Sequence, residues 1–292
     1  MNPHHLQTLL AILDEGSFEG AAGALGISPS AVSQRVKAME KEAGRVLVRR
    51  TTPVGVTEAG EILVQSARRM SLLQAETDAQ LRGRLGRVPL AVAVNADSLA
   101  TWFRPVLAAA AHWGEAALRL RLEDEAHTQI LLRRGDVLGA VTRDATPVSG
   151  CEVIELGRMR YLAVATAELR SRYSTVEGVD WARLPALRFG PNDVLQDADL
   201  DGRLAPEVRR RRRVSHVPSS EAFVEAARVG LGWALLPEAQ ASPLLETGEL
   251  VRLDDRVLEV PLHWQRWRLE SVLLDQLTDA VVTASAVLDR PR

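Results

Sequence analysis

ISPSAVSQRVKAME, residues 27–40, is the stretch that decides the fold. Ser28 is a good helix N-cap, and Pro29 suits the first helical position, where its missing N–H costs nothing. Apolar side chains that recur at helical spacing should face a core; here they are Val32, Val36 and Met39. The stretch therefore predicts a short helix with one buried face and one free face.

The free face carries the residue types that a DNA major groove accepts. Short polar side chains suit base edges and cations suit phosphates, and this face carries Ser30, Ser33, Gln34 and Lys37. Upstream, residues 17–26 (SFEGAAGALG) predict a second short helix that ends at Gly26. Two helices joined by a tight, glycine-containing turn favour a helix-turn-helix, although two packed helices of any small bundle would show the same periodicity.

The flanking segments fit the same unit. Leucines recur at helical spacing over residues 4–15 and predict a helix that completes the core. Residues 47–57 predict two short strands around a turn, which would form the hairpin wing of a winged helix-turn-helix. Arg49, Arg50 and Thr51 would lie near the DNA backbone or minor groove, and a solvated hairpin tip would explain them equally well.

A long helix follows the wing. Thr57 caps it, and the helical pattern continues to about Gly83. Its apolar residues fall near heptad spacing, and a helix of this length in a soluble protein needs a partner along it. A second copy of the chain is the expected partner, and packing within the same chain is the alternative. The polar, glycine-containing stretch 82–87 then predicts a hinge and a domain boundary.

After residue 88, predicted strands and helices alternate, which favours βαβ units, a mainly parallel sheet and two lobes. Strands are predicted at 89–94, 117–122, 139–142, 161–166, 186–189 and 233–237. Helices are predicted at 98–111, 127–134, 220–229 and 270–288, the last of which should return to the first lobe. The fold class is therefore α/β, with an N-terminal all-α winged helix-turn-helix and a two-lobe domain behind it.

Composition narrows the class of protein. A chain of 292 residues is long enough for two or three domains, and it has no apolar run long enough for a membrane span. The N-terminus is polar and lacks a signal-peptide pattern. Cys151 is the only cysteine, which excludes an internal disulfide, fits a reducing, cytoplasmic compartment and predicts a small core residue. The net charge of −2 is too small to decide about nucleic-acid binding.

The α/β part lacks the short motifs that mark common enzyme sites: it has no G-x-G-x-x-G, Walker loop, H-E-x-x-H or G-x-S-x-G. We therefore expect neither an enzyme nor a cofactor. His127 lies beside acidic residues, but no second His or Cys has ligand spacing, so no metal site is expected. A module that uses its N-terminal helices for protein contacts is another alternative, and salt-sensitive binding to promoter DNA would exclude it.

The chain resembles the LysR-type transcriptional regulators along its whole length. The resemblance starts with SFEGAAGALGISPSAVSQRVKAMEKEAG, residues 17–44, and continues with TEAG at the start of the long helix. Later motifs are similar to the lysine-export-regulator branch of that family: NADSLATWF, LEDEAHT, LRRGDVLGAVT, RFGPNDVLQ, GLGWALLP and WQRWRLES.

The resemblance implies a domain plan. It consists of a DNA-binding domain at 1–57, a linker or dimerisation helix with a hinge at 58–87, and a periplasmic-binding-protein-like effector domain at 88–292. Lobe I of the effector domain would comprise 88–160 and 266–292, and lobe II would comprise 161–265.

The resemblance also implies partners and DNA contacts. The residues at positions that touch bases are Pro29, Ser30, Ser33 and Gln34, and those near phosphates are Arg35, Lys37 and Arg50. The expected partners are double-stranded promoter DNA, RNA polymerase and further copies of the chain in a homodimer or homotetramer, with no membrane. The run from Arg209 to Arg213 is expected at a solvated lobe edge, and contact with the DNA backbone is the alternative.

Polar residues at the carboxyl ends of predicted strands mark a candidate effector site, because ligands of open α/β sheets bind there. The candidates are Asp97, Ser98, Trp102, Glu123, Asp124, Glu125, Thr142 and Asp193. A helix start binds carboxylates and an acidic cluster binds cations, so together they suit an amino acid with a cationic group. The resemblance implies lysine, arginine or histidine as effector and an amino-acid exporter gene as target.

Each of these assignments has an alternative. Helix caps or solvated surface acids would explain any single acidic residue, and Trp102 and Trp233 would fit a core as well as a cleft wall. A regulator of the same family with a different effector is the remaining alternative.

Overall fold

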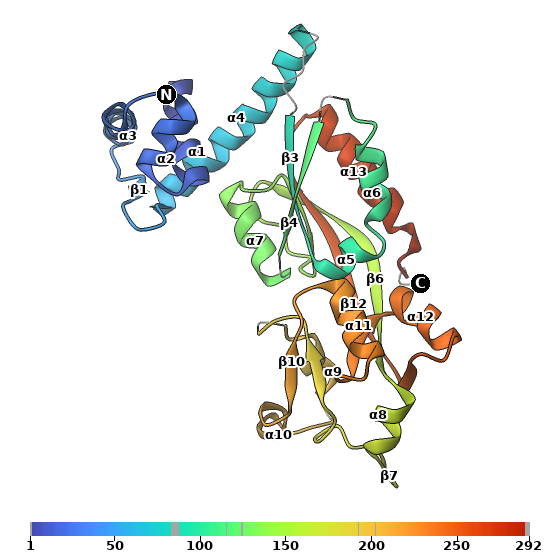
Figure 1. The fold of residues 1–292 in the computed structure, drawn as a ribbon. Coiled ribbons are helices and arrows are strands. Elements are labelled where there is room, and N and C mark those ends of the chain that lie inside the picture. Colours follow the sequence, from blue (N-terminus) through green and yellow to red (C-terminus); the bar gives the residue numbers. More distant parts are fainter. Residues whose placement is uncertain are drawn as a thin grey trace.

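The computed structural model describes residues 2–82, 88–114, 116–123, 125–191, 193–201 and 203–289. The chain forms a helical head, a long helix and two lobes that lie one below the other in Figure 1. Apart from Arg82, the predicted hinge at 82–87 lies outside the described residues. None of the described helices is long and apolar enough to cross a membrane.

Helices and a hairpin build the head. Their bounds are α1 Pro3–Glu15, α2 Phe18–Leu25, α3 Pro29–Ala43, β1 Val48–Arg49 and β2 Gly55–Val56. The hydroxyls of Ser17 and Ser28 accept backbone N–H hydrogen bonds and cap α2 and α3. Gly26 ends α2 with a left-handed backbone, φ 64°, which glycine adopts without strain. The predicted winged helix-turn-helix is confirmed, including the antiparallel wing.

A hydrophobic core of its own holds the head together. The predicted core residues of α3 are buried, with Val32 and Met39 fully buried and Val36 2% exposed. The long helix α4, Glu58–Arg82, adds Val64 and Ala67 to the same core. The head therefore packs as a unit that includes the first part of α4.

The long helix α4 has two different faces. Thr57 caps its start: the Thr57 hydroxyl accepts a hydrogen bond from the Gly60 N–H at 3.1 Å. One face packs on α1 and on α7 (Glu125–Arg134), so contacts within the chain account for that face. The other face carries exposed apolar side chains, which are Ile62, Met70, Leu73 and Leu81 at 65%, 50%, 40% and 78% exposure. Such a stripe is typical of a surface that binds another protein.

A mixed sheet extends through both lobes in the order β11-β6-β12-β5-β3-β4. Its strands are β3 Val88–Val94, β4 Ala116–Leu122, β5 Gly139–Thr142, β6 Cys151–Ala165, β11 Ala234–Pro237 and β12 Val251–Trp267. β3 pairs in parallel with β4 and β5, but β12 pairs antiparallel with β5 and β6, and β11 with β6. The prediction of a mainly parallel sheet is therefore wrong for β6, β11 and β12.

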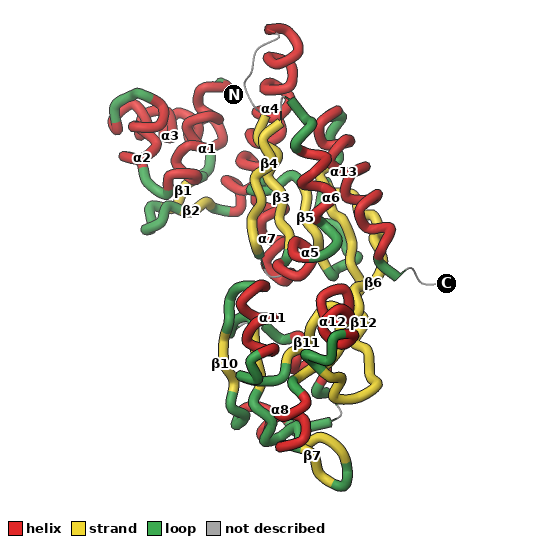
Figure 2. The backbone as a smooth tube through the Cα atoms, turned by 45° about the vertical axis from the view of Figure 1, so that its right-hand side comes forward, coloured by secondary structure: helices red, strands yellow, loops and turns green. Residues whose placement is uncertain are grey.

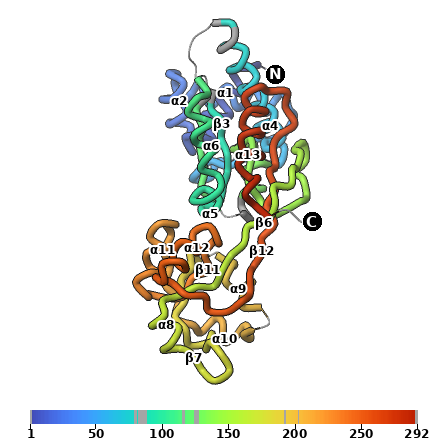
Figure 3. The backbone as a smooth tube through the Cα atoms, turned by 90° about the vertical axis from the view of Figure 1, so that its right-hand side faces the viewer, coloured from blue at the N-terminus to red at the C-terminus, as the bar shows by residue number. Residues whose placement is uncertain are grey.

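Two long strands, β6 and β12, connect the lobes, as Figure 3 shows from the side. The sequence predicted only the last part of β6 and missed β12. Both strands carry exposed charged residues, such as Glu155, Arg158 and Asp255, which interrupt the apolar pattern of a buried strand. Cys151, at the start of β6, is 2% exposed and belongs to the core as predicted.

Helices cover the sheet and complete the lobes. Lobe I has α5 Ala96–Ala100, α6 Arg104–Ala110, α7, α13 Val272–Ala284 and the 3-10 turn η1 Ser285–Val287. Lobe II has α8 Ala167–Arg172, β7 Ser174–Thr175, β8 Gly178–Val179, β9 Ala186–Arg188, α9 Leu195–Asp199, α10 Pro206–Arg210, β10 Val214–His216, α11 Ser220–Arg228 and α12 Glu238–Glu246. The final helix α13 returns to lobe I beside α6, as predicted (Figure 2).

The prediction of one helix over 98–111 is wrong. α5 ends at Ala100 and α6 starts at Arg104, with Thr101 and Phe103 as their caps. Pro105 explains the break, because proline lacks an N–H and its ring clashes with the carbonyl four residues earlier in a helix.

Candidate functional site

The exposed face of α3 is the first candidate site. Pro29, Ser30, Gln34 and Lys37 are exposed, and Ser33 is half-buried, so these side chains lie opposite the head core. In Figure 1, α3 is at the outer side of the head, away from the lobes. The helix thus presents short polar groups near its N-terminus and a cation one turn later, which suits a major groove.

The two predicted phosphate-contacting arginines are held against the head. Arg35 is half-buried and donates a hydrogen bond from Nη1 to Thr8 Oγ1 at 3.1 Å. The Arg50 guanidinium lies 5.2 Å from the centre of the Phe18 ring, a cation–π distance. Both contacts orient a cation without neutralising its charge. Contact between any of these residues and DNA stays a prediction.

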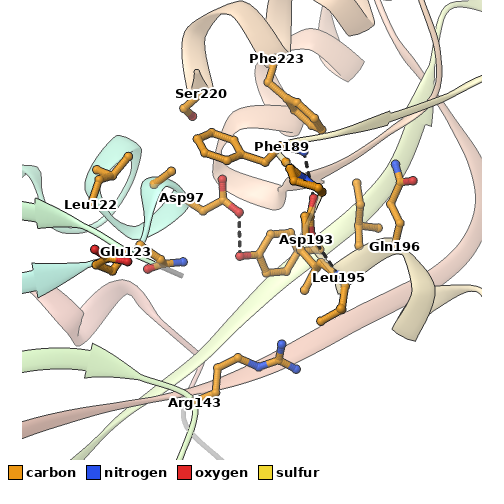
Figure 4. A pocket seen from close by; sticks show the side chains of 17 residues that line it. Asp97, Leu122, Glu123, Arg143, Phe189, Asp193, Leu195, Gln196, Ser220 and Phe223 are labelled. Carbon is orange, nitrogen blue, oxygen red and sulfur yellow. Dashed lines mark hydrogen bonds between the residues drawn. The ribbon is translucent and has the colours of Figure 1, made fainter. Parts of the chain in front are cut away.

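The second candidate site is the interlobe cleft, a cavity of about 280 Å³. Lobe I supplies the start of α5, the end of β4 and the residue after β5, while lobe II supplies residues 189–191 and 193–196 and the start of α11 (Figure 4). The polar side chains that line it are Asn95, Asp97, Glu123, Arg143, Tyr161, Asp193, Gln196 and Ser220. This volume is at the small end of ligand pockets, so the cleft suits a small molecule.

Asp97 is the acid in the cleft whose pKa is shifted by its surroundings. Its Oδ2 accepts a hydrogen bond from the Tyr161 hydroxyl at 3.0 Å, drawn as a dashed line in Figure 4. Burial raises the pKa of Asp97 to about 6; the Tyr161 hydrogen bond opposes this rise, and the charge of Asp193 adds to it. A cation in the cleft would therefore stabilise the ionised form of Asp97.

The other charged groups of the cleft are Asp193, Glu123 and Arg143. Asp193 accepts the Phe189 N–H on Oδ2 and the Leu195 N–H on Oδ1, each at 3.0 Å. Its carboxylate therefore shapes the 189–195 turn and contributes negative charge. Glu123 and Arg143 are half-buried and line the lobe I side of the cleft.

The structure thus brings three predicted effector residues together: Asp97, Glu123 and Asp193. Asp124 lies outside the described residues, and Glu125 is the first residue of α7. Within the part of the chain that the structure describes, no group of three His, Cys, Asp or Glu side chains could hold a metal ion.

Other predicted cleft residues lie outside its lining. Ser98 and Thr142 are fully buried: Ser98 lies within α5, and Thr142 is the last residue of β5. The Thr142 hydroxyl accepts a hydrogen bond from the Asp144 N–H at 3.1 Å, which fixes the turn after β5. Trp102 and Trp233 are 4% and 0% exposed, so both are core residues rather than cleft walls.

Several cleft residues were missed from the sequence, namely Arg143, Tyr161, Phe189, Gln196, Ser220 and Phe223. Arg143 had a signal, since it is the first residue beyond the strand that ends at Thr142. Tyr161 had none, because it lies inside β6 and reaches the cleft only where that strand crosses between the lobes.

The arginine run of lobe II is not a solvated edge throughout. Arg209 pairs with Asp201 at 2.7 Å, and the Arg212 side chain is fully buried 3.6 Å from Asp197. Burial lowers the pKa of Arg212, and the neighbouring charge of Arg188 lowers it further. The expectation of solvation is wrong for Arg212 because Asp197 attracts it inward. In Figure 1, α10 lies in the lower part of lobe II, away from the head.

Two family profiles cover most of the chain. Residues 3–61 match the bacterial regulatory helix-turn-helix protein, lysR family, and residues 82–284 match the LysR substrate binding domain. The chain belongs to the LysR family of transcriptional regulators. The predicted resemblance and fold class are therefore confirmed, and α3 lies within the segment that matches the LysR-family helix-turn-helix.

Similar proteins place this LysR-family chain within the LysG/ArgP branch. The lysine export transcriptional regulatory protein LysG of Corynebacterium efficiens is 67% identical over 98% of both chains. The full-length structure of LysG from Corynebacterium glutamicum with bound effector Arg has a TM-score of 0.85 at 64% identity and covers 100% of both chains. ArgP from Mycobacterium tuberculosis has a TM-score of 0.86 at 40% identity, over 99% of this chain and 98% of that one. These relatives are named as regulators and not as enzymes.

Proposed function

We propose that this LysR-family regulator senses a basic amino acid in the interlobe cleft and, in response, controls transcription of an amino-acid exporter gene. It acts in the cytoplasm, where it binds promoter DNA through α3 and the wing. Arginine is the first candidate effector, followed by lysine and histidine.

The observation that carries the proposal is the charge of the cleft. Asp97 and Glu123 line one side of a small cavity, and Asp193 adds a third negative charge. Arg143 faces the same cavity and can pair with a carboxylate. A basic amino acid has two cationic groups and one carboxylate, so it matches this set. The arginine bound to LysG of Corynebacterium glutamicum, at 64% identity, supports the same assignment.

The roles follow from charge and position. The guanidinium and the α-ammonium group of arginine distribute over Asp97 and Glu123, and its α-carboxylate lies toward Arg143. Tyr161 holds the Asp97 carboxylate in place through the 3.0 Å hydrogen bond. Phe189 and Phe223 supply apolar wall for the methylene groups.

The proposed assembly rests on α4. The exposed stripe of Ile62, Met70, Leu73 and Leu81 pairs with the same stripe of a second copy, and two such dimers form a tetramer. The domain plan 1–57, 58–87 and 88–292 then gives each dimer two heads for two DNA half-sites. Pro29, Ser30, Ser33 and Gln34 contact bases, while Arg35, Lys37 and Arg50 contact phosphates.

Regulation requires that the effector prefer one lobe arrangement. Arginine contacts both lobes and stabilises the closed cleft, which changes the spacing of the heads and the access of RNA polymerase to the promoter. Arginine can shift this equilibrium only by its difference in affinity for the two arrangements. The same difference must appear as a change in arginine affinity when DNA is bound.

Calorimetric titration with matched ligands tests the proposal. Arginine should bind saturably, whereas citrulline, which has nearly the same shape without the cation, should bind at least about 10-fold more weakly, because a charge-assisted hydrogen bond is worth about 1.5–3 kcal/mol. Lysine against norleucine repeats the comparison. Equal binding of arginine and citrulline would contradict a cation-recognising cleft.

The DNA half of the proposal needs its own variant. Gln34→Ala should weaken binding to the cognate promoter fragment and leave the arginine titration unchanged. Gln7→Ala, an exposed glutamine on α1, is the matched control. Loss of arginine binding in Gln34→Ala, with promoter binding retained, would contradict the division of roles.

A further inference from the structure

The loop 143–150 joins β5 to β6 by crossing over β12. β5 and β6 are parallel to each other, because each pairs antiparallel with β12, and parallel strands need a crossover connection. β5 ends opposite His263 of β12, and β6 begins opposite Trp267 of the same strand. The loop therefore passes along β12 between these two residues, and Gln265 lies midway between them.

Gln265 bonds this loop from a buried position. It is 0% exposed. Its Nε2 donates hydrogen bonds to the carbonyl oxygens of Asp144 and Thr146, at 3.0 Å and 2.9 Å. Its Oε1 accepts the Val148 N–H at 3.1 Å. Both polar atoms of the amide are thus used on one loop, from which Gln265 is separated by 117 to 121 residues of chain.

Apolar packing contributes little to the position of this loop. Residues 144–147 are exposed, and Val148 is the first buried residue after them. An exposed segment gains little free energy from apolar burial, so its path depends on hydrogen bonds. The three hydrogen bonds of Gln265 reach both the start and the end of the exposed part.

The direction of the Arg143 side chain follows from its two neighbours. Thr142 is held in β5, where it pairs with His263. The Thr142 hydroxyl accepts the Asp144 N–H at 3.1 Å, and Gln265 donates to the Asp144 carbonyl oxygen. The backbone is therefore fixed on both sides of Arg143, whose side chain lines the interlobe cleft (Figure 4).

We propose that Gln265 is a positioning residue for effector recognition: it holds Arg143 where the guanidinium meets the α-carboxylate of the effector. Gln265 is buried and does not belong to the cleft lining, so it acts through Arg143. This inference rests on the proposed function, in which Arg143 pairs with that carboxylate. Loss of Gln265 should therefore weaken recognition of the carboxylate and leave recognition of the cationic groups unchanged.

Calorimetric titration with arginine and agmatine separates the two kinds of recognition. Agmatine is arginine without its carboxylate, and it keeps both cationic groups. The unchanged chain should bind arginine about 10-fold or more tightly than agmatine, since agmatine lacks the charge-assisted hydrogen bond to Arg143. Gln265→Met has a side chain of similar length that cannot donate a hydrogen bond. It should reduce the preference for arginine to about 3-fold or less, by weakening the binding of arginine alone.

A double variant connects this effect to Arg143. Arg143→Gln should itself remove most of the preference for arginine, and adding Gln265→Met should then change neither affinity further. Equal weakening of both ligands by Gln265→Met, or a loss of arginine affinity that is the same with and without Arg143, would reduce Gln265 to a stabilising residue and overturn the proposal.

The unchanged chain distinguishes this proposal from the proposed function. Failure to bind arginine would overturn both. Tight binding of arginine and agmatine with equal affinities would leave the cation-recognising cleft intact and overturn the positioning role, because the carboxylate would then have no partner to position.

Thr278→Val is the matched control. Thr278 is 8% exposed, and its hydroxyl accepts the Trp264 Nε1–H at 3.2 Å. Trp264 precedes Gln265 in β12, so its side chain points to the opposite face of the strand. Loss of this buried hydrogen bond should lower the unfolding temperature of the lobes and leave the preference for arginine over agmatine unchanged. A preference reduced as much as in Gln265→Met would show that any damage to β12 suffices, and would overturn the proposal.

Asp144→Ala tests the same loop from the surface and covers the case in which Gln265→Met does not fold. Asp144 is exposed, and its carboxylate accepts the Thr146 N–H at 2.8 Å and a hydrogen bond from Gln129 Nε2. Removal of a negative charge beside Arg143 would by itself favour the carboxylate of arginine. A lower preference for arginine over agmatine is nevertheless expected, because the loop is loosened. An unchanged or higher preference would overturn the proposal.

Discussion

α3 carries its polar face on one continuous helix, whereas the interlobe cleft collects its polar groups from both lobes. In the head, Val32, Val36 and Met39 fix the direction of that face through a core built from nearby segments. In the cleft, Asp97 and Tyr161 form a hydrogen bond although 64 residues separate them. A substitution in the head core should therefore unfold the whole head and abolish DNA binding. A substitution in the cleft should remove only the contribution of that side chain to ligand affinity.

The largest effect should come from the head core. Val36→Asp places a carboxylate without a partner at a position that is 2% exposed, which costs several kcal/mol, enough to unfold a small unit. Promoter binding should fall at least about 100-fold, while the arginine titration stays unchanged, because the lobes have a separate core. Calorimetry and fluorescence polarisation measure the two effects.

Ala38→Asp is the control for this variant. It adds the same charge to an exposed position of the same helix and should leave the unfolding temperature of the head nearly unchanged. If Val36→Asp also abolished arginine binding, the head and the lobes would unfold as one cooperative unit. That result would contradict the independence of the head from the cleft.

The same contrast explains what the sequence could predict. The signals for α3 are local: the Ser28 cap, the Pro29 start and an apolar repeat, and the structure confirms all of them. β12 has no such signal, because charged residues around Asp255 interrupt it and its pairing partners are distant in the chain. Pro105 is a local signal for a helix break, but the helix predicted over 98–111 runs through it.

The cleft was predictable only where a strand end placed a residue at its edge. Asp97 and Glu123 both follow predicted strands, and both line the cavity. Ser98 and Thr142 were predicted from the same strand ends and are buried, because Ser98 lies within α5 and Thr142 is still the last residue of β5. To predict Tyr161 as a cleft residue, one must know where β6 crosses between the lobes, and no local sequence pattern shows this.

The second largest effect should come from the cleft. Asp97→Asn removes one charge from the side that receives the arginine cations, and arginine affinity should fall about 10- to 100-fold, since charge-assisted hydrogen bonds are worth about 1.5–3 kcal/mol. Promoter binding without arginine should not change. Asp279→Asn, an exposed acid on α13, is the control. Equal arginine affinity in both variants would remove Asp97 from the recognition of the cation.

The pH dependence of arginine binding also tests whether Asp97 binds the cation. The pKa of Asp97 is about 6 without ligand, and the ionised form binds the cation. Affinity for arginine should therefore be at its plateau above pH 7 and fall as the pH drops through 6, reaching about one tenth near pH 5, where about a tenth of the groups are ionised. Asp97→Asn should show no such fall over this range. A fall of the same size in the variant would assign the titration to another group.

The smallest effect should come from a helix cap in the head. The Ser28 hydroxyl accepts the Ala31 N–H at 3.2 Å, and Ser28→Ala should cost about 1 kcal/mol of head stability. For a unit of this size, the unfolding temperature of the head should fall by about 4–8 °C. Thr166→Ala removes the matching cap of α8, where the hydroxyl accepts the Leu169 N–H at 3.2 Å, and should lower only the transition of the lobes. Because each cap stabilises its own helix, two calorimetric transitions that move independently would establish two units. A single transition that both variants lower equally would show that α4 couples the head to the lobes more strongly than their separate cores suggest.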